Sequence, residues 1–293
     1  MLNIVIPFFD FTESNTNRKN LNLQIESLSK TSEVRVVLIE GIFSKPLPDY
    51  SSQVYKHIKV KATSTIWIKE NLINIGISNL PKNWKNVCWL DKDIKFLNPN
   101  WISEALLKLE SCDIIQPWSE CIFLNEVNEI QNVDTTFFKK AIGQKNRIVS
   151  FCSNQKGDLN TWAHVGHAWC MTRNWYDKIG GLFEGAIIGG GDGLIADCIR
   201  QEYNSKIYKI YGNHFNQYCS KFKGVKIGWV NGLITHYHHG DMSNRQYINR
   251  LEVLNKHNFN IDSDLEWTTE GVLTITNKDL ESDIIKYFKS RNE

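Results

Sequence analysis

The chain has 293 residues, of which 42% are hydrophobic and 23% charged, enough to bury a core without a disulfide or a metal ion. Its 34 Lys and Arg nearly balance 32 Asp and Glu, and no basic tail or acidic block interrupts the sequence. General charge attraction to nucleic acid or to a membrane surface is therefore not expected.

Targeting and cysteine patterns point to a cytoplasmic protein, either free or peripheral to a membrane face. No apolar run approaches the ~20 residues of a membrane-spanning helix, and Met1 leads directly into a strand-like segment rather than a signal peptide. The seven Cys are scattered, odd in number and never in Cys-x-x-Cys spacing. This pattern favours reduced core residues over a disulfide framework or a zinc site.

Strand-like and helix-like segments alternate along the first half of the chain. Short apolar runs predict strands at 2–6, 34–39, 87–90 and 113–116. Apolar residues at helical spacing predict helices at 18–30, 67–80 and 101–110. This alternation predicts an α/β fold with a mixed, mostly parallel central sheet and helices on both faces.

The second half of the chain has a weaker pattern. Residues 120–160 predict loops or a small β excursion, and a glycine-rich stretch follows at 179–192. A helix is predicted to begin at Asp192, with a strand over 227–235 and another helix over about 247–254. Because the sequence shows no repeat and no linker, we expect a single domain over residues 1–293.

Two carboxylates directly follow the apolar strand at 87–90. Asp91 and Asp93 lie at its carboxyl end, where open α/β sheets bind ligands. Carboxylates this close repel each other unless a cation compensates them, and oxygen ligands suit Mg²⁺ or Mn²⁺. The pair predicts a divalent metal site; the alternative is a solvated turn in which Asp93 caps a local group.

Three histidines follow the strand predicted over 227–235. Strand alternation places His236 and His238 on one side and His239 on the other. One of them completes the ion held by the aspartates, or all three form their own metal site with Asp241, or they lie in a solvated turn. The sequence leaves these alternatives open.

Three glycines precede an acidic residue at Gly189, Gly190, Gly191 and Asp192. Glycine permits close approach of a ligand to the backbone. A carboxylate at the start of a helix stays ionised and can act as a general base; the alternative is a helix-capping Asp after a turn. No Gly-Lys-Ser/Thr follows, so the stretch is not a phosphate-binding loop.

Taken in this order, several stretches resemble GT-A glycosyltransferases, most closely the β-1,4-galactosyltransferase and polypeptide N-acetylgalactosaminyltransferase group with its bacterial and viral relatives. The resemblance spans about residues 2–250. It rests on five stretches, with Arg245 and Tyr247 after the last: Ile4–Phe8, Trp67–Gly76, Trp89–Ile94, Gly180–Asp192 and His236–Gly240. The family's acceptor motif has Trp and paired acidic residues where this chain has three glycines and one Asp, so acceptor identity does not carry over.

The resemblance implies a GT-A (Rossmann-like) fold and a metal-dependent hexosyltransferase. The enzyme would move a sugar from a nucleotide-diphosphate sugar, with a UDP-sugar favoured, to a saccharide, lipid-linked or protein acceptor. It also implies a nucleotide-sugar-binding half at 1–117, an acceptor-binding half at 118–260 and a C-terminal extension at 261–293. One base opposite the leaving group predicts inversion; the oligomeric state stays open.

The resemblance also implies roles for individual residues. The expected ligands of Mn²⁺ or Mg²⁺ are Asp91, Asp93, His236 and His239, and the expected catalytic base is Asp192. Donor-binding residues, with Phe8 on the base and Lys69 or Arg18 at the phosphates, are expected at Pro7, Phe8, Phe9, Asp10, Arg18, Trp67, Lys69, Asn71, Leu90, Asp91 and Lys92. Acceptor-binding residues, with the tryptophans as stacking surfaces, are expected at Trp162, His164, Trp169, Gly190 and Gly191.

Two other functions stay open from the sequence. One is a metal-dependent hydrolase or nucleotidyltransferase built on His236, His238, His239 and Asp241. The other is a nucleotide-sugar-binding module without catalysis, against which the joint presence of the Asp pair, Asp192 and the histidines argues. One ion per chain, retained mainly with nucleotide, would favour the transferase.

Overall fold

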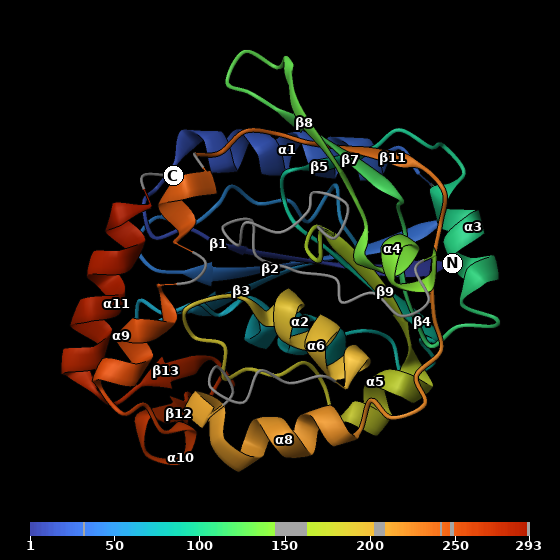
Figure 1. Ribbon diagram of the computed structural model, residues 1–293. Helices are drawn as coiled ribbons and strands as arrows, with labels where there is room; N and C mark the ends of the chain where they lie inside the picture. Colours follow the sequence, from blue (N-terminus) through green and yellow to red (C-terminus); the bar gives the residue numbers. More distant parts are fainter. Residues whose placement is uncertain (32, 144–162, 202–208, 241, 247–248, 292–293) are drawn as a thin grey trace.

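The computed structural model describes residues 1–31, 33–143, 163–201, 209–240, 242–246 and 249–291 (Figure 1). Its main sheet has the strand order β10-β6-β9-β4-β1-β2-β3. These strands are β1 (Leu2–Phe9), β2 (Val34–Ile42), β3 (Lys56–Lys61), β4 (Asn86–Leu90), β6 (Ile114–Gln116), β9 (Ala168–Thr172) and β10 (Ile227–Trp229). Strand β9 is antiparallel to β4 and β6, and the other pairs are parallel. The predicted mixed, mostly parallel sheet is confirmed.

Helices cover both faces of the main sheet, and the side chains of its strands pack into a separate hydrophobic core on each face. Ile4 and Ile6 of β1 face the core that contains α1 (Asn15–Ser29) and α3 (Trp101–Lys108). Val5, between them, faces the opposite core. That core contains α2 (Lys69–Ser78), α4 (Phe137–Gly143), α5 (Arg173–Ile179), α6 (Gly191–Arg200) and α8 (Gly212–Ser220). Burial on both faces explains why the strands read as continuous apolar runs.

A second sheet of four strands has the order β5-β11-β7-β8. It contains β5 (Ile94–Phe96), β7 (Glu120–Leu124), β8 (Ile130–Thr135) and β11 (Leu233–His236). The prediction of one strand over 227–235 is therefore wrong. Strand β10 belongs to the main sheet and β11 to the second, and Asn231 and Gly232 lie between them. Strands β7 and β8 form the β excursion expected after residue 120.

The C-terminal region packs against α2. It contains α9 (Leu251–Lys256), α10 (Ile261–Asp264), β12 (Leu265–Trp267), β13 (Leu273–Ile275) and α11 (Lys278–Ser290). Asn71 of α2 donates to the carbonyl oxygen of Gly271 over 3.0 Å and accepts from the N–H of Leu273 over 3.0 Å. This side chain is buried and its amide bonds to the hairpin; that it binds the donor stays a prediction.

A disulfide joins α6 to α8 through Cys198 and Cys219. The expectation that the cysteines are all reduced is therefore wrong, because packing of α6 against α8 brings together two cysteines 21 residues apart in the sequence. Cys88, Cys112, Cys121 and Cys170 are free, and Cys152 lies outside the described residues. No helix among the described residues is long and apolar enough to cross a membrane.

Candidate metal centre and catalytic site

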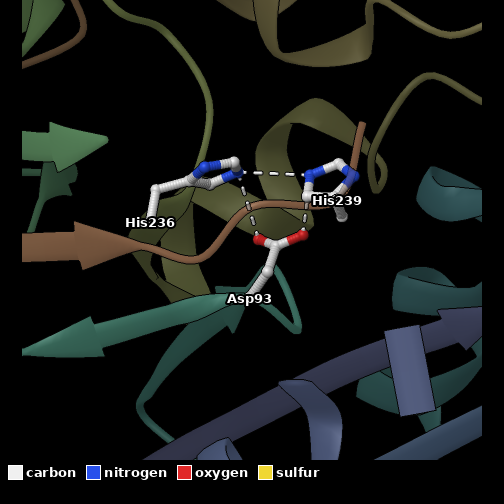
Figure 2. Close-up of side chains that lie close together, drawn as sticks. All are labelled: Asp93, His236 and His239. Carbon is white, nitrogen blue, oxygen red and sulfur yellow. Dashed lines mark hydrogen bonds and ion pairs between the residues drawn. The ribbon is translucent and has the colours of Figure 1, made fainter. Parts of the chain in front are cut away.

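Asp93, His236 and His239 come together at the carboxyl edge of the main sheet (Figure 2). Asp93 lies in the turn between β4 and β5, and His236 ends β11, which pairs with β5. The N–H of Tyr237 donates to the carbonyl oxygen of Asp93 over 2.8 Å. This bond fixes the turn against the end of β11, and the chain then brings His239 back over the carboxylate.

The three side chains form a close, buried group. His239 Nε2 lies 3.0 Å from Asp93 Oδ2, and His236 Nε2 lies 3.6 Å from Asp93 Oδ1. The two Nε2 atoms are 3.2 Å apart. The exposed fractions are only 3% for Asp93, 7% for His236 and 9% for His239, so bulk water does not separate these groups.

The protonation states of this group suit a cation. Burial lowers the pKa of His236 and of His239, against the opposing charge of Asp93. Burial acts to raise the pKa of Asp93, but the neighbouring His239 and Lys92 lower it well below its ordinary value. Neutral imidazoles and an ionised carboxylate are the forms that bind metal ions.

One carboxylate oxygen of the group lacks a hydrogen-bond partner among the described residues. Oδ1 of Asp93 is buried and has no hydrogen-bond partner among the residues that the structure describes, which is costly for a carboxylate oxygen. It faces the Nε2 atom of His236. A divalent ion held by one carboxylate and two imidazoles would satisfy all three groups, and the two nitrogen ligands fit Mn²⁺ better than Mg²⁺, which prefers oxygen.

Arg245 lies on one side of the metal triad, which consists of Asp93, His236 and His239. Its Nη2 atom lies 2.8 Å from His239 Nε2. Its backbone carbonyl accepts a hydrogen bond of 2.7 Å from the hydroxyl of Tyr287 on α11. The C-terminal helix, for which we predicted no role, therefore fixes the segment that follows the histidines.

A second buried charged group lies beside the triad and centres on Lys69. The Nζ atom of Lys69 is 2.6 Å from Asp91 Oδ1 and 2.9 Å from Asp192 Oδ2. Burial acts to lower the pKa of Lys69, but the two carboxylates raise it above its ordinary value. The pKa of Asp192 is raised, because burial outweighs the opposing charge of Lys69. These groups come from α2, from the turn after β4 and from the first turn of α6.

Asp91 bonds to members of this second group and is not part of the triad. Besides Lys69, its Oδ2 atom accepts from the N–H of His167 over 3.1 Å, and its own N–H donates to the carbonyl of His167 over 2.8 Å. Among the described residues, the group that could hold a metal ion contains Asp93, His236 and His239 alone. The expectation that Asp91 is a metal ligand is therefore not supported by the arrangement.

The segment that contains His164 and His167 runs past the carboxylate of Asp192. A Cβ atom on Gly166 would lie 3.8 Å from Asp192 Oδ2. The rings of His164 and His167 stack with their centroids 4.0 Å apart. His167 has a φ of 79°, an uncommon conformation for a residue other than glycine. This backbone conformation accompanies the paired hydrogen bonds to Asp91.

Three of the expected acceptor-binding residues have other roles, and a fourth is not described. Trp169 is fully buried and donates to the carbonyl oxygen of Val165 over 2.7 Å, so it is a core residue. Gly190 has a φ of 99°, and a Cβ there would lie 2.6 Å from Arg250 Nη2. A Cβ on Gly191 would overlap Oε1 of Glu70. At these two glycines the absence of a Cβ makes room for the chain's own Arg250 and Glu70, and acceptor binding there stays a prediction. Trp162 lies outside the described residues.

Most expected donor-binding side chains also point elsewhere. Pro7, Phe8 and Leu90 are buried, so Phe8 packs in the core rather than on a base. Arg18 donates to the carbonyl oxygens of Lys45 and Pro46, and Asp10 accepts from the N–H and hydroxyl of Thr12. Lys92 contacts the triad directly, 3.4 Å from Asp93 Oδ2, whereas Lys69 contacts Asp91 and Asp192.

A half-buried aromatic cluster lies at the carboxyl ends of β1 and β2. Phe9 packs edge-on against Trp67 at 4.9 Å between ring centroids. Phe11 packs against Phe43 at 4.7 Å and stacks on Phe288 of α11 at 4.6 Å. The sequence singled out Phe9 and Trp67 but missed the contribution of the C-terminal helix.

Comparison with protein-family models and with curated protein sequences gives no match. Glycosyltransferases are among the solved structures that are similar to the chain. A TarS fragment from S. aureus has a TM-score of 0.49 and 11% identity, with 99% of this chain and 71% of that chain covered. A Drosophila β1,4-galactosyltransferase 7 variant with manganese, UDP-Gal and xylobiose has a TM-score of 0.45 and 11% identity, with 100% and 99% covered. The catalytic domain of the same Drosophila enzyme with xylobiose has a TM-score of 0.41 and 11% identity, with 94% of each chain covered.

Proposed function

We propose that the protein is a metal-dependent glycosyltransferase that moves a sugar from a nucleotide-diphosphate sugar to an acceptor hydroxyl. The observation that carries the proposal is the pairing of two buried charged groups at one edge of the sheet. One is the triad of Asp93, His236 and His239, and the other is the ion pair of Lys69 with Asp192. The order of the motifs in the sequence supplies the donor class, with UDP favoured as the nucleotide.

The triad is the proposed binding site for Mn²⁺ or Mg²⁺. A divalent ion there would neutralise negative charge on the diphosphate as it leaves. Arg245 lies against His239 and Lys92 against Asp93, so both side chains add positive charge at the same place. The proposed donor-binding region extends from the triad to the half-buried Phe9 and Trp67.

Asp192 is the proposed general base. Its side chain is 18% exposed, so an acceptor hydroxyl can reach it. Burial raises the pKa of Asp192, which makes it a stronger base than an exposed carboxylate. Asp192 takes the proton as the acceptor oxygen attacks the anomeric carbon. The bond to the diphosphate breaks on the opposite side, and this single displacement inverts the configuration.

The hydrolase or nucleotidyltransferase alternative has less support. His238 is not part of the metal-binding group formed by the described residues, and Asp241 lies outside them. The triad instead takes its carboxylate from Asp93, the second member of the Asp pair. One ion per chain is therefore the expected stoichiometry.

Thermal unfolding with a panel of nucleotide-diphosphate sugars, each with and without Mn²⁺, tests the proposal. A ligand at ~100 times its dissociation constant adds about 2.7 kcal/mol of stability. We expect one donor to raise the unfolding temperature only when Mn²⁺ is present. Asp192→Asn should keep this shift while it lowers transfer by about 10²–10⁴-fold. If no donor shifts unfolding with or without metal, the proposal is wrong.

A further inference from the structure

We infer that Lys69 is a positioning residue that ties Asp192 to Asp91 and so holds the proposed base beside the metal triad. The inference deepens the proposed function and rests on it. Three elements meet at one ammonium group: α2 supplies Lys69, the turn after β4 supplies Asp91, and the first turn of α6 supplies Asp192.

The contacts leave this group little freedom. Distances of 2.6 and 2.9 Å from Nζ are those of charge-assisted hydrogen bonds. Lys69 is only 6% exposed, so water does not compete well for its protons. The second oxygen of Asp91 is held by the backbone N–H of His167. Asp192 Oδ2 is therefore connected through Lys69 and Asp91 to the backbone at the strand end.

The same contacts argue against the role that we expected from the sequence. A lysine that binds diphosphate needs an ammonium group that an anion can reach. The ammonium of Lys69 already has two carboxylate partners, and those carboxylates would repel a phosphate. Lys69 instead supplies the counter-charge that allows Asp91 and Asp192 to lie close together.

A double-mutant cycle on transfer separates the two roles. If Lys69 acts through Asp192, Lys69→Met should lower kcat by about 10²-fold, as expected for a misplaced catalytic group. In the Asp192→Asn background the same substitution should lower kcat by less than about threefold, because its partner is already lost. Lys69→Arg keeps the charge and should recover part of kcat. Mn²⁺ affinity and donor KM should stay within about twofold of the wild type in all these variants, since Lys69 lies outside the triad.

Lys221→Met is a matched control. The ammonium of Lys221 donates to the carbonyl oxygen of Ile179 over 2.8 Å, and it contacts neither charged group of the site. Its removal should leave kcat and donor KM unchanged. The inference is overturned if Lys69→Met lowers kcat by the same factor in both backgrounds. A rise in donor KM at constant kcat would also overturn it, because that result assigns Lys69 to the phosphates.

Urea unfolding of the same variants tests the ion bridge without reference to activity. Lys69→Met should lower the unfolding midpoint of the wild type, because it leaves two carboxylates without their counter-charge. The shift should be much smaller in an Asp91→Asn/Asp192→Asn background, where no counter-charge is needed. Equal shifts in the two backgrounds would refute the bridge. If the wild type transfers no sugar, the proposed function fails, and this measurement still decides the bridge.

Discussion

The sharpest test of the metal centre is Asp93→Asn, which keeps the shape of the side chain and removes its charge. Asp93 is the one anionic ligand of the triad, beside two imidazoles whose pKa values are lowered by burial. Loss of a group that merely orients a ligand weakens metal binding by about 10–100-fold. Loss of the sole anionic ligand should therefore weaken Mn²⁺ binding by at least about 100-fold.

This loss of Mn²⁺ affinity should appear as a measurable change in thermal stability. At a Mn²⁺ concentration of ~100 times its dissociation constant, the wild type gains about 2.7 kcal/mol, and a variant that binds 100-fold more weakly gains about 0.4 kcal/mol. The difference of about 2.3 kcal/mol corresponds to about 3–4 °C for a chain of this length. The assay is differential scanning fluorimetry with Mn²⁺ and, separately, with EDTA, which subtracts any effect of the substitution on the metal-free fold.

Asp91→Asn is the matched control, two residues away in the same turn. Because Asp91 bonds to Lys69 and His167 instead of joining the triad, it should keep the full Mn²⁺-dependent shift. Equal shifts for Asp93→Asn and the wild type would refute the assignment of the triad. Loss of the shift in Asp91→Asn would restore Asp91 as a ligand.

Three further predictions follow from particular contacts. His239→Ala should abolish the Mn²⁺-dependent shift and His238→Ala should preserve it, since only His239 belongs to the triad; titration calorimetry with Mn²⁺ distinguishes them. Asn71→Ala should cost about 1–3 kcal/mol in urea unfolding, because it leaves two buried backbone groups without partners. Tyr287→Phe should cost about 1 kcal/mol in the same assay, since its hydroxyl donates to the Arg245 carbonyl. An unchanged midpoint in either variant would contradict the corresponding contact.

The sequence predicted the layered fold because strands buried on both faces read as apolar runs. It failed where the assignment depends on partners distant in the chain. The segment 227–235 reads as one strand, yet its two halves enter different sheets on either side of Asn231 and Gly232. Strand β9 has no alternation of its own, and its place between β4 and β6 is set by pairing to both.

The sequence also supplied the candidates for the site but not the choice among them. Strand alternation placed His236 and His238 on the same side. The strand, however, ends at His236, so the alternation does not continue, and Gly240, with a φ of 113°, follows directly after His239. The chain that leaves the strand brings His239, and not His238, to Asp93. The charge of Lys69 was evident from the sequence but its partners were not, since one of them is more than a hundred residues away.

The two aspartates of the turn illustrate why the metal belongs at one and not at the other. Asp91 is balanced within the protein, because a buried lysine and a backbone N–H occupy its two oxygens. Asp93 is more deeply buried, and its histidine neighbours have pKa values lowered by burial. Lys92 lies 3.4 Å from its Oδ2 atom, while Oδ1 has no hydrogen-bond partner among the described residues. A buried carboxylate oxygen without a hydrogen-bond partner is costly. A bound cation would remove that cost, and so Mn²⁺ should stabilise the protein through Asp93 and not through Asp91.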